Sequence, residues 1–147
     1  MRGTGVESSD CFSMMGVRIM GQATNPLRDR TKKYALRVIR LAQSLPDDKV
    51  SRVISNQLLR SGTSVGANYR AACRAKSPAD FCSKMTTVEE ETDESMYWME
   101  LIIEGGLMPD TRLQPLYKEA EEILKMTVAS INTARRGIND SKKPSKR

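Results

Sequence analysis

The chain has 147 residues, 39% hydrophobic and 29% charged, and a domain of this length buries about two thirds of its unfolded surface. It contains no histidine, which excludes serine–histidine and cysteine–histidine catalytic pairs and histidine-based zinc sites. Its three cysteines show no CxxC spacing, no run of about 18 apolar residues occurs, and we expect no secretory signal. We therefore expect a cytoplasmic, single-domain protein that is not an enzyme and has no metal, cofactor or membrane partner.

The net charge of +6 is distributed unevenly along the chain. Residues 28–76 carry twelve basic and three acidic side chains, whereas residues 80–104 carry one basic and eight acidic side chains. Residues 137–147 are basic again. This segregation has two interpretations: the basic and acidic segments pair within the fold or between subunits, or the basic segment forms a surface for nucleic acid.

Residues 1–24 show no steady apolar period, which predicts a disordered extension. Asn25-Pro26 then predicts a helix start, because the asparagine side chain can cap a free N–H and proline has none to lose. The apolar stripe of this first helix ends at Leu45, before Pro46, and it comprises Tyr34, Ala35, Val38, Ile39, Leu41, Ala42 and Leu45.

Asp47 or Asp48 can cap a second helix, whose predicted apolar stripe crosses the small-residue stretch RSGTSVGAN at residues 60–68 without losing phase. Glycine costs about 1 kcal/mol relative to alanine inside a helix, so a small face at residues 62, 63 and 66 indicates that a neighbouring backbone approaches closely. No GxGxxG or GxxxxGK[ST] pattern occurs, which argues against a phosphate loop. The stripe comprises Val50, Val53, Ile54, Leu58, Ser61, Val65 and Ala72.

Ser77-Pro78 predicts the start of a third helix, with Asp80 at its positive end and Gly105-Gly106 as its stop. A fourth helix is expected from Thr111 or Leu113, with Pro115 in its first turn, to 136. Four helices joined by short turns predict an all-α, up-and-down antiparallel four-helix bundle over residues 25–136. A basic disordered tail is expected over residues 137–147.

Three groups of side chains invite a chemical role. Glu90, Glu91 and Glu94 suggest a di-iron site, but such sites need Glu-x-x-His pairs, so we interpret them as a solvated acidic face. Asn68, in phase with the apolar stripe, either fixes helix register from the core or contacts a ligand. Trp98 and Tyr97 are interpreted as an edge-of-core or subunit-contact pair rather than a base-stacking platform.

The basic residues of the first helix have little acidic balance nearby. Lys33, Arg37 and Arg40 share one helical face, which is either simply solvated or faces phosphate groups or an acidic partner helix. The residues that we predict to bind nucleic acid are Lys32, Lys33, Arg37, Arg40, Arg70, Arg74, Lys142 and Lys143.

The segment NQLLRSGTSVGANYRAACRAKSPADFCSKMTTVEEETDESMYWMELI resembles the bacterial four-helix-bundle family of 23S rRNA-intervening-sequence proteins. The flanking segments NPLRDRTKKYALRVIRLAQSLP and LQPLYKEAEEILKMTVASI are similar to the family's first and last helices, so the likeness covers about residues 25–135. Related accessory variability proteins of diversity-generating retroelements are basic pentamers that bind nucleic acid. The resemblance therefore implies a homopentamer, with a tightly packed motif that includes Arg60, Ser61, Gly62, Gly66 and Asn68.

The leading hypothesis is a non-enzymatic, oligomeric scaffold or accessory protein that binds RNA or another nucleic acid through basic helix faces and the tail. The alternative is a protein-interaction module, in which basic and acidic helices pair between subunits or with a protein partner and nucleic acid plays no part.

Overall fold

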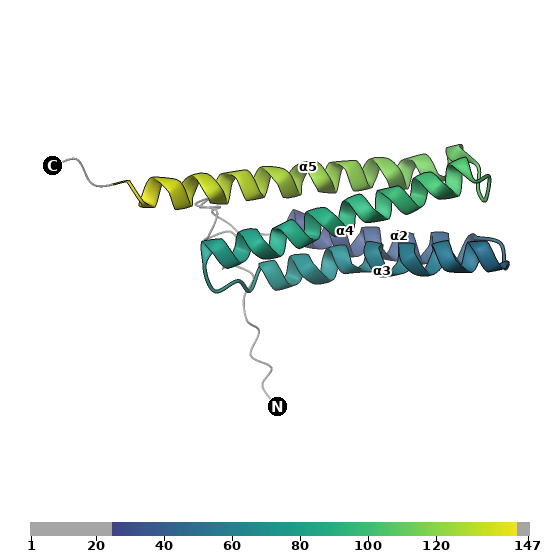
Figure 1. Ribbon diagram of the computed structural model, residues 1–147, viewed down its shortest axis with the longest axis horizontal. Helices are drawn as coiled ribbons and strands as arrows, with labels where there is room; N and C mark the ends of the chain where they lie inside the picture. The colour runs from purple at the N-terminus through teal and green to yellow at the C-terminus, as the bar shows by residue number, and fades with distance from the viewer. Residues whose placement is uncertain (1–24, 144–147) are drawn as a thin grey trace, which may run out of the picture.

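The computed structural model describes residues 25–143, which form an antiparallel four-helix bundle (Figure 1). Its helices are α2 (Pro26–Ser44), α3 (Lys49–Ala72), α4 (Pro78–Glu104) and α5 (Asp110–Ser141). Short connections reverse the chain between consecutive helices, and the described residues contain no strand. The predicted all-α, up-and-down bundle is confirmed. The extension predicted for residues 1–24 lies outside the described residues.

Side-chain caps begin three of the helices where the sequence predicts them. The Asn25 side chain accepts a hydrogen bond from the backbone N–H of Arg28 at 3.1 Å. Asp48 caps α3 by accepting from the N–H groups of Val50 and Ser51, each at 2.9 Å. Ser77 accepts from the N–H of Asp80 at 3.1 Å. These bonds satisfy donors that have no partner within the helix, and they fix where each helix starts.

The turn between α4 and α5 requires glycine. Gly105 caps the end of α4, and Gly106 has a φ of +69°, in the left-handed region that other residues rarely adopt. The predicted stop at these two glycines is confirmed.

The last helix starts one residue before Thr111, the earlier of its two expected starts, but the expected C-terminal limit and the first-turn position of Pro115 are wrong. α5 begins at Asp110, so Pro115 is its sixth residue rather than part of the first turn, and its missing N–H leaves the carbonyl of Thr111 without the usual helical bond. The helix also continues to Ser141, so residues 137–141 are helical instead of belonging to a disordered tail. Figure 1 shows these last turns extending past the ends of α3 and α4.

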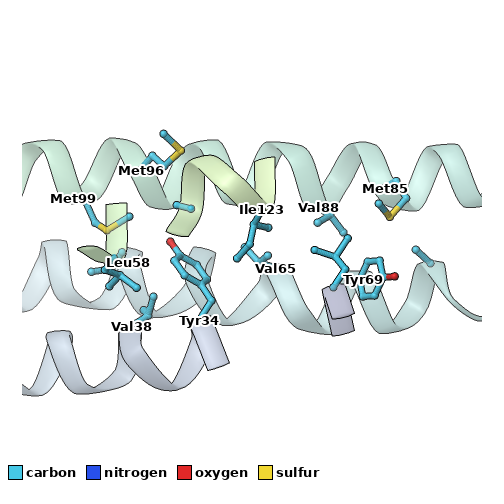
Figure 2. Close-up of a cluster of buried hydrophobic side chains, with 14 of the residues drawn as sticks. Tyr34, Val38, Leu58, Val65, Tyr69, Met85, Val88, Met96, Met99 and Ile123 are labelled. Carbon is cyan, nitrogen blue, oxygen red and sulfur yellow. The ribbon is translucent and has the colours of Figure 1, made fainter. Parts of the chain in front are cut away.

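All four helices contribute to one hydrophobic core, shown in Figure 2. Tyr34 and Val38 of α2 meet Leu58 and Val65 of α3, with methionines of α4 opposite them. Fully buried residues along the four helices include Tyr34, Val38, Leu58, Val65, Met85, Val88, Met99, Ile102, Leu113 and Ile123. The flexible methionines fill the irregular space between the branched side chains.

The first turn of α3 faces the core with a different residue from those predicted. Val50 and Val53 are 58% and 57% exposed, whereas Ser51 is fully buried. The Ser51 hydroxyl donates to the Asp48 carboxylate at 2.7 Å, so this polar side chain is satisfied inside the protein. Because the cap orients this turn with Ser51 inward, Val50 and Val53 face solvent.

The small face of α3 packs directly against α2, as predicted. A Cβ atom at Gly62 would lie 2.8 Å from both γ carbons of Val38, closer than carbon atoms approach in proteins. A Cβ at Gly66 would lie 3.4 Å from the backbone of Thr31. Residues 60–72 stay within the helix. Gly62 and Gly66 therefore serve a close contact between the two helices, whereas Thr63, also expected on this face, is only partly buried.

One buried polar contact joins α2 to α4 across the core. The Tyr34 hydroxyl lies 2.7 Å from Ser95 Oγ, and Ser95 donates its own proton to the Thr92 carbonyl at 2.7 Å. Tyr34 must therefore be the donor to Ser95. Burial raises the pKa of Tyr34 to about 12, since the core disfavours the phenolate.

The interfaces between helices are unequal. α3 with α4 has the most extensive contact, followed by α4 with α5 and α2 with α3, whereas α2 with α5 has much the smallest of these four. The seam between α2 and α5 is therefore the thinnest of the seams that close the bundle.

We predict that Gly62→Ala destabilises the protein by about 1–3 kcal/mol, even though alanine favours helix, because Val38 is β-branched, fully buried and unable to move aside. The matched control is Gly137→Ala, where no atom lies within 4 Å of the added Cβ. That change should raise stability by up to about 1 kcal/mol. Chemical denaturation measures both, and equal effects at the two sites would contradict the close packing.

We also predict that Ser95→Ala is more destabilising than Tyr34→Phe. The alanine leaves the buried Tyr34 hydroxyl without an acceptor, at a cost of about 1–3 kcal/mol, whereas phenylalanine leaves Ser95 bonded to Thr92. Urea unfolding of the two single variants and the double variant gives the comparison. A double variant less stable than Ser95→Ala alone would show that the hydroxyl has another partner.

Candidate nucleic-acid interface

The C-terminal half of α2 and the first turn of α5 together form a basic crevice. Arg37 and Arg40 from α2 and Arg112 from α5 line it, and it encloses about 250 Å³. Apolar side chains complete its walls, including Leu41 and Leu116. We call this feature the α2–α5 crevice. It brings two of the predicted binding residues together with an arginine that the sequence analysis did not select.

The three arginines of the α2–α5 crevice have no acidic counterpart. No aspartate or glutamate lines the crevice, and none of the three makes an ion pair within residues 25–143. Elsewhere on this seam, Arg30 makes a two-pronged contact with Glu119, with N–O distances of 2.8 and 3.1 Å. That carboxylate raises the pKa of Arg30. Along this seam, the charge of Arg30 is balanced by Glu119, whereas the charges of the three crevice arginines are not balanced by any carboxylate in residues 25–143.

A second basic cavity lies between α2 and α3 and encloses about 550 Å³. We call it the α2–α3 groove. Three cationic residues line it, Arg28 and Lys32 from α2 and Arg70 from α3, together with the carboxylate of Asp29. The remaining lining residues are small or neutral: Asn25, Thr31, Ala35, Thr63, Gly66 and Ala67. The predicted residues Lys32 and Arg70 therefore share one site.

A buried asparagine holds the two walls of the α2–α3 groove together. Asn25 is only 6% exposed, and its Oδ1 accepts from the Tyr69 hydroxyl at 2.9 Å as well as from the Arg28 N–H. Its Nδ2 donates to Cys73 Sγ at 3.6 Å. The start of α2 is thereby fixed to the end of α3. From the sequence, Asn25 is expected only to cap α2.

The other predicted binding residues lie outside both cavities. Lys33 is exposed on α2, and Arg74 is exposed just beyond the end of α3. Lys142 caps α5, and Lys143 pairs with Asp140 at 3.0 Å while both remain largely exposed. The eight predicted residues thus do not form one compact site.

Arg60 of the packed motif joins α3 to the acidic helix α4. It contacts both Glu91 and Glu94, and Trp98 donates to Glu94 at 3.1 Å. The hydrogen bond from Arg60 holds the pKa of Glu94 below its usual value. Some of the basic and acidic side chains of the two segments therefore pair with each other within the fold. Trp98 is partly buried beside the core, as the edge-of-core interpretation predicts.

Asn68 does not serve as a buried register residue. Its side chain is partly exposed and donates to the Ser64 carbonyl of its own helix at 2.9 Å. The inward positions are taken by Val65 and Tyr69, so Asn68 lies at the side of the helix. Its predicted structural role in the core is therefore wrong.

Neither a metal site nor a membrane span is found in residues 25–143. No group of three or more cysteine, aspartate or glutamate side chains there is arranged to hold a metal ion. Within the same range, no helix has both the length and the hydrophobicity needed to cross a bilayer.

Fold and site together define a small four-helix-bundle protein with clusters of excess positive charge at two edges of its first described helix. The family model described as 23S rRNA-intervening sequence protein matches residues 26–129, and the chain belongs to this family. A crystal structure from Bacteroides thetaiotaomicron, of a protein with unknown function from the S23 ribosomal protein family, has 34% sequence identity and a TM-score of 0.68. The match covers 71% of this chain and 97% of that one. No curated protein matches.

We predict that Glu94→Gln lowers the melting temperature more at pH 7 than at pH 3. The folded-state pKa of Glu94 is lowered by Arg60, so its contribution to stability is present above the unfolded pKa and is lost as pH falls through the folded pKa. Glu90→Gln, at an exposed position with no ion pair in residues 25–143, is the control. Identical shifts for both variants at pH 7 would contradict a specific pair.

Proposed function

We propose that this protein is a non-enzymatic, cytoplasmic homo-oligomeric scaffold that binds RNA or another nucleic acid through the basic edges of α2. The observation that carries the proposal is the α2–α5 crevice, where Arg37, Arg40 and Arg112 converge without any acidic residue. Like charges held together on a fold are stabilised by a polyanion, and phosphate groups match the forked geometry of arginine.

The arrangement of charge supports contact with a phosphate backbone rather than with bases. The described residues lining the two basic cavities include no aromatic side chain on which a base could stack. The exposed Tyr97 lies instead on α4 among acidic residues. Binding should therefore depend strongly on salt and weakly on sequence.

Assembly into a homo-oligomer is supported by apolar side chains on the surface. Leu36 of α2 is 46% exposed, and Val50 and Val53 of α3 are more than half exposed. Their burial between subunits would remove this apolar area from water. The retroelement accessory proteins that the sequence resembles are basic pentamers that bind nucleic acid, which points to a pentamer here.

A second candidate is a protein-interaction module that uses its acidic helix. Glu90, Asp93, Glu100 and Glu104 are exposed on α4, whereas Glu91 and Glu94 share one ion-pair partner, Arg60. The exposed carboxylates remain for a basic surface of another subunit or of a protein partner. In that function nucleic acid plays no part.

The test is binding of a fluorescent single-stranded RNA 20-mer at several salt concentrations. We predict that the triple variant Arg37→Gln, Arg40→Gln, Arg112→Gln binds at least about tenfold more weakly and has a log–log salt slope reduced by about 2. The matched control removes three charges elsewhere, at the exposed residues Lys49, Lys118 and Arg135, which make no ion pair within residues 25–143, and should change binding less.

Light scattering on the same proteins separates the two functions. A mass near five times 16.5 kDa, with RNA binding lost only in the crevice variant, supports the nucleic-acid scaffold. If the crevice variant loses assembly instead, the interaction module is favoured. If the wild type binds no RNA at low salt, the proposed function is wrong.

A further inference from the structure

We propose that the α2–α3 groove binds a phosphate monoester, carried either by a free nucleotide or by the 5′-phosphorylated end of an RNA chain. The second source rests on the proposed function, whereas the first does not. Arg28, Lys32 and Arg70 supply the cations, and the small residues of the groove supply the space.

The charge balance of the groove favours a dianion. Its three cationic residues and the one carboxylate of Asp29 leave two positive charges in excess. A phosphate monoester carries about −1.5 to −2 at neutral pH, whereas each internal phosphodiester of RNA carries one negative charge. A terminal phosphate therefore matches the groove better than an internal one. None of the three cationic residues makes an ion pair within residues 25–143.

The size and lining of the groove suit a single nucleotide. Its volume of about 550 Å³ lies within the range typical of small-ligand sites, about 300–1,000 Å³. Ala35, Thr63 and Ala67 present no large side chain, which leaves room for a sugar and a base beside the phosphate. By contrast, the α2–α5 crevice encloses about 250 Å³ and has an apolar wall, so it offers less room for a whole nucleotide.

The walls of the groove are rigidly joined at one end. Asn25 connects α2 to Tyr69 of α3 through buried hydrogen bonds, and Gly66 lies against the backbone of Thr31. The backbones that carry the cationic residues on the two helices are thus held at a fixed separation before any ligand arrives. Such preorganisation reduces the ordering cost of binding.

Calorimetric titration of the full-length protein with AMP and with adenosine tests the proposal directly. We expect AMP to bind and adenosine to bind at least about tenfold more weakly, because only AMP carries the phosphate. Arg70→Gln should weaken AMP binding by about tenfold. Ala67→Glu, which adds a carboxylate at an exposed position in the groove, should abolish it. Lys118→Gln is the control for loss of one surface charge elsewhere.

Two RNA 10-mers, one with a 5′ phosphate and one with a 5′ hydroxyl, distinguish the sources of the phosphate. Tighter binding of the phosphorylated 10-mer, removed by Ala67→Glu, identifies an RNA end as a ligand. AMP binding without that preference identifies a free nucleotide. The proposal is overturned if AMP binds no more tightly than adenosine and the 5′-phosphorylated 10-mer binds no more tightly than the 5′-hydroxyl 10-mer. It is also overturned if Lys118→Gln weakens AMP binding as much as Arg70→Gln does.

The proposed function can fail separately. If AMP binds but the 5′-hydroxyl 10-mer does not bind at low salt, the groove stands without the nucleic-acid scaffold. If the 5′-hydroxyl 10-mer binds through Arg37, Arg40 and Arg112 alone, the scaffold stands without the groove. Circular dichroism of each variant shows whether a loss of binding reflects loss of the fold.

Discussion

The close approach of α2 to α3 at Gly62 is the contact on which the rest of this bundle depends. Val38 occupies the space that any larger residue at position 62 would need, so α2 packs close to the backbone of α3. This close packing brings Asn25 within hydrogen-bonding reach of Tyr69 and lets the Tyr34 hydroxyl meet Ser95 on α4. On each side of α2, its basic side chains line a cavity together with residues of a neighbouring helix, α3 on one side and α5 on the other.

The fold was predictable because its signals are local. As caps, Asn25 and Ser77 act through hydrogen bonds within three residues, and Gly106 acts through its own backbone angle, so the sequence alone predicts these helix ends. Which residues of a single helical turn face the core is harder to predict from the sequence. Ser51 is buried in place of Val50 and Val53 because a cap satisfies its hydroxyl, and the burial of a polar residue in place of an apolar one breaks the hydrophobic pattern.

The site was predictable only in part. The basic residues of α2 were evident from their sequence, but their division between two cavities depends on which neighbour lies on each side of the helix. Arg112 was missed because it lies far along the chain from Arg37 and Arg40, although an antiparallel bundle does bring the start of the last helix beside the end of the first. Arg60 and Glu94 pair across helices, which reduces the apparent segregation of charge.

The thin seam between α2 and α5 has a consequence for how the chain folds. The three consecutive helix pairs are close in sequence and share the larger interfaces, whereas joining α2 to α5 closes a loop of most of the described chain. This topology predicts that contacts in that seam form late in folding. Interactions formed after the transition state govern the rate of unfolding more than that of folding. The seam thus controls how long the closed bundle persists.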